Sequence, residues 1–185
     1  AGTIHKGLKY TSNAWNFEAS VVGATSGGSK LSIVPEVTNV EVDGALVPVK
    51  GLAVKTGEKA TMEVNFIELT EDIIKAATFG TAGTSADATN YDVIESKSDI
   101  TTGDYWENIA FVGKTLEGKN IIAILDNALC TSGFEQEGKN KEGAIGKYTF
   151  ECYAELGSDL DKLPWHIYYP KASTTTGESD TPKES

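Results

Sequence analysis

Arginine is absent from this 185-residue chain, in which all 16 basic residues are lysine and 27 residues are acidic. The formal net charge is -11 at pH 7. Forked guanidinium groups are the usual contacts to guanine and phosphate, so an acidic chain without them is a poor candidate for tight nucleic-acid binding. The charge favours a surface that repels phosphate, with simple solubility as the alternative explanation.

Cysteine and histidine are also scarce, and the chain has only Cys130, Cys152, His5 and His166. Two distant cysteines exclude a disulfide scaffold or a zinc knuckle. We interpret both as free thiols on or near strands, in a reducing compartment. We expect His5 to lie on a mobile arm and His166 to face solvent from a strand. The sequence therefore predicts no catalytic residue, metal site or cofactor, and we expect the protein not to be an enzyme.

Long apolar runs are missing as well. The longest, such as "IIAIL" at 121–125, fall far short of the roughly 20 residues that cross a bilayer. The opening residues lack the apolar region of a secretory signal. We expect neither a membrane-spanning helix nor a retained signal.

Alternation of apolar and polar residues is the dominant pattern. It runs through "TMEVNFIE" at 61–68 and "KYTFECYAE" at 147–155 with the period of half-buried strands. Further strand candidates lie at 91–95, 108–116, 120–129 and 163–170. The predicted fold class is therefore mainly β: two packed β-sheets, sandwich or barrel-like, with one flanking α-helix.

Two local signals predict a hairpin and the helix. Asp43-Gly44 is favoured in a two-residue hairpin turn, and Pro48 after it predicts an edge strand or a projecting loop. Thr70 is typical of a helix N-cap, and Gly80 of the left-handed residue that ends a helix. The helix residues expected to pack on a sheet are Ile73, Ile74, Ala77 and Phe79.

Composition divides the chain into an N-terminal arm at 1–15, a β domain at 16–170 and a polar tail at 171–185. The segment "GATSGGSK" at 23–30 approaches a phosphate-binding loop, but Ser29 separates its last glycine from Lys30 and a strand-like run follows. We interpret it as a glycine-rich hairpin loop. Asp159 and Asp161 lack the glycine and the later glutamate of a calcium-binding loop and favour a solvated turn.

The order of the segments resembles the major tail tube protein of long-tailed bacteriophages, including relatives in phage-tail-like bacteriocins. The resemblance covers about positions 17 to 170. Its parts, each weak alone, are the Pro-Glu strand before the Asp-Gly hairpin, a "VKG" projection, a strand ending "ELT" before one helix, a "DYWEN" turn, an "ILDNAL" strand and a final "IYYP".

The resemblance implies two packed sheets and a helix, assembled into hexameric rings that stack into a tail tube. The implied partners are further copies of the chain, a tape-measure protein in the bore, and tail terminator and baseplate or tip proteins. DNA would pass through the bore without specific binding, and the implied location is the virion tail, after assembly in the host cytoplasm. Phage or bacteriocin, and a flexible or a contractile tail, both stay open.

A bore lined by acids would let DNA slide, whereas a basic lining would hold it through counterion release. Because one polar sheet face must meet water, the candidates for lining the bore are Asn39, Glu41, Glu63, Asn65, Glu151 and Glu155. The segment 43–59 and the arm are expected to join successive rings, and deletion of 45–56 is expected to stop polymerisation. The contact candidates are Asp43, Gly44, Leu46, Pro48, Lys50, Lys55 and Lys59.

Three alternatives remain from the sequence. The first is another assembly protein, such as a capsid decoration protein or a component of a secretion tube. The second is a secreted carbohydrate-binding sandwich that would use the exposed rings of Trp15, Trp106, Trp165, Tyr168 and Tyr169. The third is a hydrolase with scattered carboxylates, which no anchored motif supports.

Overall fold

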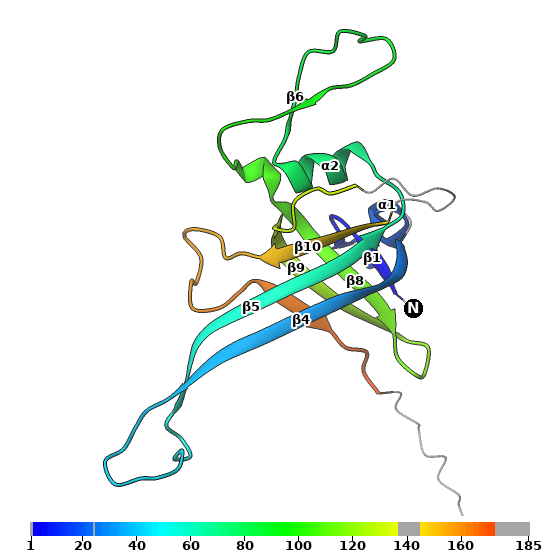
Figure 1. Ribbon diagram of the computed structural model, residues 1–185. Coiled ribbons are helices and arrows are strands. Elements are labelled where there is room, and N and C mark those ends of the chain that lie inside the picture. The colour runs from blue at the N-terminus through cyan, green and yellow to red at the C-terminus, as the bar shows by residue number, and fades with distance from the viewer. Residues whose placement is uncertain (1, 24, 137–144, 173–185) are drawn as a thin grey trace, which may run out of the picture.

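The computed structural model describes residues 2–23, 25–136 and 145–172. The fold is mainly β and sandwich-like, with a large antiparallel sheet, two small sheets and two α-helices (Figure 1). The predicted tail at 171–185 lies almost wholly outside the described residues. The predicted fold class is confirmed, whereas the division of the chain into layers differs from the prediction.

The elements follow one another closely along the chain. The strands are β1 (Thr3–His5), β2 (Tyr10–Thr11), β3 (Ala14–Trp15), β4 (Thr25–Asn39), β5 (Ala53–Phe66), β6 (Thr81–Ala82), β7 (Ile94–Glu95), β8 (Trp106–Lys114), β9 (Asn120–Cys130), β10 (Gly146–Cys152) and β11 (Trp165–Tyr168). The helices are α1 (Phe17–Ser20), α2 (Glu71–Thr78) and a short 3₁₀ turn, η1 (Thr102–Asp104).

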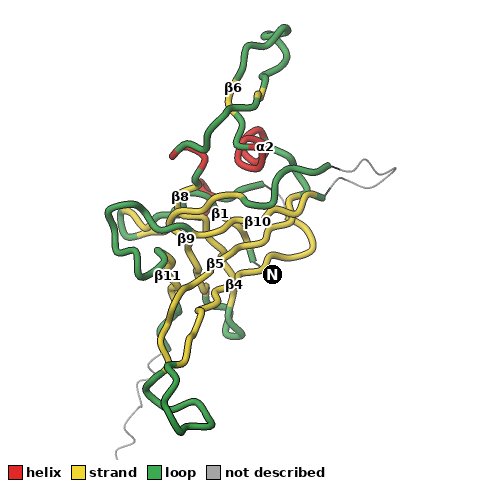
Figure 2. The backbone as a smooth tube through the Cα atoms, turned by 60° about the vertical axis from the view of Figure 1, so that its left-hand side comes forward, coloured by secondary structure: helices red, strands yellow, loops and turns green. Residues whose placement is uncertain are grey.

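Strand β9 belongs to both layers of the sandwich. The main sheet has the order β1-β8-β9-β10-β5-β4, and β11 also pairs with β9. The two partners of β9 occupy different halves of it, because Ile122–Leu125 pair with β11 whereas Ala128–Cys130 pair with β10. The two layers are thus one continuous sheet joined at β9, and not two separate sheets. They cross each other in Figure 2.

The main core fills the space between the strands β5 and β10 on one side and β8 and β9 on the other. The rings of Trp106 and Phe150 stack there with centroids 4.8 Å apart. Alternation places Met62, Val64 and Phe66 of β5 in this core, as the sequence predicts. Cys130 and Cys152 are buried free thiols on β9 and β10.

A second, smaller core lies on the opposite face of β8 and β9. There Leu8, Trp15 and Phe17 pack on residues such as Ile122 and Ile124. Strands covered on both faces need apolar residues at successive positions, which explains the continuous run "IIAIL".

The N-terminal segment that provides this cover is part of the domain. Strand β1 pairs with β8, and Ile4, His5 and Leu8 are all buried. The expectation that His5 lies on a mobile arm is therefore wrong, and no arm ends at residue 15. An antiparallel partner and a second core hold the segment in place, neither of which its short apolar pattern signals.

The hairpin of β4 and β5 extends far beyond the core (Figure 1). Asp43 and Gly44 do not join its strands, because β4 ends at Asn39 and β5 begins at Ala53. They form a turn inside a loop of residues 40–52, closed by a hydrogen bond from Ala45 N to Val42 O of 3.0 Å, with Gly44 at a φ of 85°. The two-residue hairpin is thus wrong, and the projection predicted from Pro48 is confirmed.

Helix α2 lies across one end of the core. Thr70 caps it by accepting a hydrogen bond from Ile73 N, as predicted, and Ile73 and Ala77 are buried while Ile74 and Phe79 are half-buried. The left-handed residue at its end is Phe79, with a φ of 52°, and not Gly80. Gly80 instead lies against Ile94, which leaves no room for a β-carbon.

The glycine-rich segment at 25–30 is strand and not a hairpin loop. It forms the start of β4, with a register irregularity between Thr25 and Ser29 opposite β5. Gly27 and Gly28 take φ angles of 78° and 90°, which only glycine adopts without strain. The segment is therefore a bulge at the edge of the sheet.

Candidate functional site

Strand β4 leaves one edge of the main sheet open. It pairs with β5 alone among the described residues, although it runs for 15 residues. The opposite edge, β1, is shielded by the chain itself, since Lys6 N donates to Ser20 O and Val22 N donates to Ile4 O. A long unpaired edge is a template for pairing with another chain, and monomers normally blunt it.

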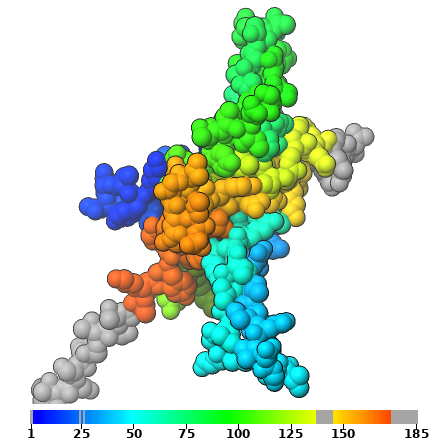
Figure 3. All heavy atoms as spheres, turned by 90° about the vertical axis from the view of Figure 1, so that its left-hand side faces the viewer, coloured from blue at the N-terminus to red at the C-terminus, as the bar shows by residue number. Residues whose placement is uncertain are grey.

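The open edge continues into the projecting loop of residues 40–52. Figure 3 shows this loop at one end of the molecule and the segment 80–101 at the other. Leu46 is fully exposed and Val47 is 71% exposed. The predicted contact residues Asp43, Gly44, Leu46, Pro48 and Lys50 all lie in the loop, whereas Lys55 and Lys59 lie on β5.

The predicted lining residues separate into two groups. Glu63, Asn65 and Glu151 lie on the outward side of β5 and β10, which together with the same side of β4 we call the polar face. Asn39 and Glu41 lie near the projecting loop, and Glu155 follows β10 in a turn. The structure therefore brings half of the candidates together on one surface.

The polar face carries both signs of charge. Register alternation places Lys30, Lys59 and Lys147 on it beside the three glutamates Glu36, Glu63 and Glu151. Lys147 Nζ lies 2.9 Å from Glu63 Oε2. This hydrogen bond, with the further attraction of Lys30, holds the pKa of Glu63 below its ordinary value. Sequence alternation found Glu63 and Glu151, but it missed Glu36 and the lysines that face these carboxylates across the strands.

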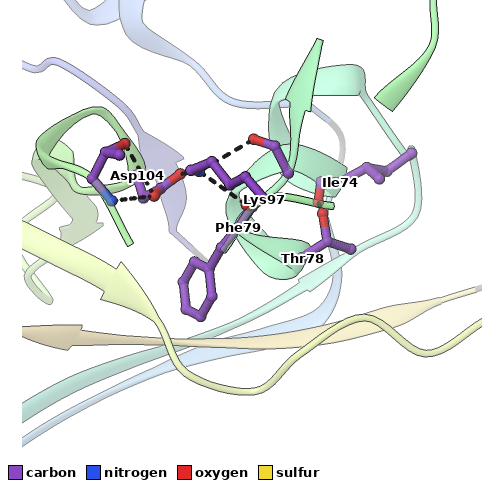
Figure 4. A network of polar contacts seen from close by, with 7 residues as sticks. Ile74, Thr78, Phe79, Lys97 and Asp104 are labelled. Carbon is purple, nitrogen blue, oxygen red and sulfur yellow. Dashed lines mark hydrogen bonds and ion pairs between the residues drawn. The ribbon is translucent and has the colours of Figure 1, made fainter. Parts of the chain in front are cut away.

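A buried ion pair anchors the second projecting segment, 80–101, to the end of α2 (Figure 4). Lys97 Nζ donates to Asp104 Oδ1 at 2.6 Å and to Phe79 O at 2.9 Å. Burial disfavours the charge on Asp104, but the hydrogen bonds from Lys97 and Thr101 outweigh it and lower its pKa. A lysine at the carbonyl end of a helix also interacts favourably with the helix dipole.

The two histidines make different contacts. His5 is buried between two hydroxyls, with Nδ1 2.9 Å from Ser20 Oγ and Nε2 2.8 Å from Thr3 Oγ1. Burial lowers the pKa of His5. His166 is exposed on β11, as predicted, and its Nδ1 lies 2.9 Å from Asp126 Oδ1. The Ser20 hydroxyl also donates to the Asn16 carbonyl at 2.8 Å. The contact between His5 and Ser20 therefore belongs to the hydrogen bonds that hold the N-terminal segment together.

The aromatic residues considered for carbohydrate stacking do not form one platform. Trp106 is buried in the core, and the indole N–H of Trp165 donates to Glu58. Trp15 packs edge-on against Tyr168 with centroids 5.0 Å apart, while Tyr169 is 72% exposed. Contacts within the domain therefore involve four of the five rings.

Comparison with protein-family models and with curated proteins found no match to this chain. Within residues 2–23, 25–136 and 145–172, no helix is long and apolar enough to cross a membrane. The same residues contain no group of three or more His, Cys, Asp or Glu side chains placed to hold a metal ion.

Proposed function

We propose that this chain is a self-assembling structural protein whose copies form rings that stack into a tube, as the resemblance to phage tail tube proteins implies. The observation that carries the proposal is the open 15-residue edge of β4, which leads into a loop with a fully exposed leucine. Such a combination is a liability in a monomer, but a neighbouring copy would satisfy the edge and cover the loop.

Pairing along β4 would join copies around a ring. The open edge of β4 has unpaired N–H and C=O groups, and a second copy can supply the missing partners. The projecting loop would join one ring to the next, since it lies well away from the core and buries none of its own apolar side chains. The tube would hold a tape-measure protein and later admit DNA.

Passage of DNA needs a wall that does not trap phosphate. The net charge of -11 supports a repelling bore, because the summed field of many copies acts over the whole channel. The polar face alone does not supply this repulsion, as its lysines match its glutamates in number. Glu41 and Glu155, which lie outside the strands of that face, would contribute the rest.

Electron microscopy of the concentrated chain, by negative staining, tests the proposal. We expect stacked rings for the wild-type chain. A deletion of 45–56 is unsuitable, because it would remove the first four residues of β5. Replacement of residues 41–51 by a short glycine-containing turn leaves both strands whole and is expected to give folded single rings or monomers. Long tubes from that variant would contradict the role of the loop, and monomers from the wild type at every concentration would contradict the proposal itself.

A further inference from the structure

The polar face contains a hollow of about 220 Å³ at the glycine bulge of β4. We call it the glycine hollow, and its lining residues are Gly27, Gly28, Ser29, Lys30, Glu63, Asn65 and Lys147. It is formed by three strands that lie side by side, β4, β5 and β10. Two ammonium groups and one carboxylate line it, which makes it locally cationic on a strongly acidic chain.

The backbone of the bulge is open to a ligand. Both glycines have positive φ angles, and an added β-carbon at Gly28 would meet nothing within 4 Å. A main chain without side chains permits close approach of a ligand, which is why glycines surround many phosphate sites. The Asn65 amide donates to Gly28 O at 3.3 Å and holds the bulge against β5.

The two lysines differ in their contacts. The Lys147 ammonium group is paired with Glu63, whereas that of Lys30 has no hydrogen bond or ion pair within the described part of the chain and interacts with Glu63 through charge alone. Glu63 accepts a hydrogen bond from the Lys147 ammonium group, which has three N–H groups, and keeps that ammonium group at the hollow. Lys30 stands opposite Glu63 in the strand register, so both cations lie around the same carboxylate.

We infer that the glycine hollow binds one phosphate group, with Lys30 and Lys147 as its cationic contacts. The Ser29 hydroxyl and the exposed main chain of the bulge can add hydrogen bonds to phosphate oxygens. Lysine serves here as a point charge, which suits a single phosphate and reads no base sequence. Glu63 opposes the anion and keeps the binding weak. The inference concerns the surface of one unassembled copy, because in the proposed ring a neighbouring strand would cover the main chain of β4. A contact this weak does not trap passing phosphate.

Equilibrium dialysis of the full-length chain against radiolabelled inorganic phosphate at low salt tests the inference. Lys30→Gln and Lys147→Gln are each expected to weaken binding by about two- to fivefold, the range of an exposed charge contact. Glu63→Gln removes the competing carboxylate and is expected to strengthen binding by a similar factor. Lys162→Gln, which removes a lysine paired with Asp159 outside the hollow, is the matched control and is expected to change nothing.

A short duplex DNA, followed by fluorescence anisotropy, distinguishes the two sources of phosphate. Binding of both probes assigns the hollow to the nucleic-acid backbone, and each lysine removed should lower the salt dependence by about one charge. Binding of inorganic phosphate alone assigns it to the free anion. Equal phosphate binding by the wild type and by the Lys30→Gln/Lys147→Gln double variant, or an equal loss in Lys162→Gln, would overturn the inference. Because the dialysis is carried out on the unassembled chain at low protein concentration, failure here is distinct from failure to assemble.

Discussion

Asn108 holds Leu8 at both ends of its peptide. Leu8 N donates to Asn108 O at 3.2 Å, and Asn108 Nδ2 donates to Leu8 O at 3.1 Å. Asn108 adopts a φ of 47° near the start of β8. This left-handed residue interrupts the pairing of β8 with β9. Its two hydrogen bonds hold the N-terminal segment, with the fully buried Leu8, against the second core.

Replacing Asn108 separates the hydrogen bond from the backbone strain. Asn108→Gly keeps the left-handed backbone but loses the amide, and we expect it to lower the free energy of unfolding by about 1 to 2 kcal/mol. Asn108→Ala loses the amide and strains the backbone, so its cost should be about 1 kcal/mol greater. Urea denaturation measures both, and equal values for the two variants would contradict the account of strain.

His5 predicts a pH dependence of stability. Burial lowers its pKa below the ordinary 6.5, so the folded state binds fewer protons than the unfolded state. The stability that neutral His5 provides is complete above pH 6.5 and is lost as the pH falls through the lowered pKa. Urea denaturation from pH 7.5 to 5.5 should show this decline in the wild type and in His166→Gln, but much less of it in His5→Gln. An unchanged slope in His5→Gln would contradict the assignment.

The Tyr148 hydroxyl is buried and has no hydrogen-bond partner within the described residues. Burial also raises the pKa of Tyr148. Because an unsatisfied buried hydroxyl is costly, we expect Tyr148→Phe to increase the free energy of unfolding by about 1 kcal/mol. Tyr153→Phe, at a residue that is 36% exposed, should change stability by less than about 0.5 kcal/mol. A destabilised Tyr148→Phe protein would show that its hydroxyl has a partner.

The ion pair between Lys97 and Asp104 is expected to contribute to the stability of the fold, because it anchors the segment 80–101 to the end of α2. Lys97→Met keeps the length of the side chain but leaves a buried carboxylate without its cation and the Phe79 carbonyl without its donor. We expect a loss of about 2 to 4 kcal/mol in thermal or urea unfolding. The double variant Lys97→Met/Asp104→Asn should recover part of that loss, since no buried charge remains. Equal stability of the single and double variants would contradict an energetic coupling between the two side chains.

Strands that are buried on one face are the easiest to predict. Alternation in β5 and β10 correctly predicts the core positions Met62, Val64 and Phe150. In a strand with a period of two, only one face carries the apolar residues, so only that face can lie toward the core. The N-cap at Thr70 is equally predictable, because capping depends only on the Thr70 hydroxyl and the first helical turn that follows it.

Contacts between residues far apart in the sequence cannot be predicted in the same way. Nothing in the sequence around Leu8 indicates that it packs on β8, because its hydrogen-bond partner Asn108 lies 100 residues away. The lysines that neutralise Glu63 come from two other strands, so only the register reveals them. Of the candidate surface, sequence could predict the projection and the carboxylates, but not the balance of charge.

A cryo-EM reconstruction of the particle formed by the full-length chain tests the central claim most directly, because it shows what lies beside β4. We predict a ring in which the backbone of each β4 hydrogen-bonds to a neighbouring copy and the projecting loop contacts the next ring. Rings joined through other surfaces that leave β4 bare, or a bore whose wall is predominantly lysine, would contradict it.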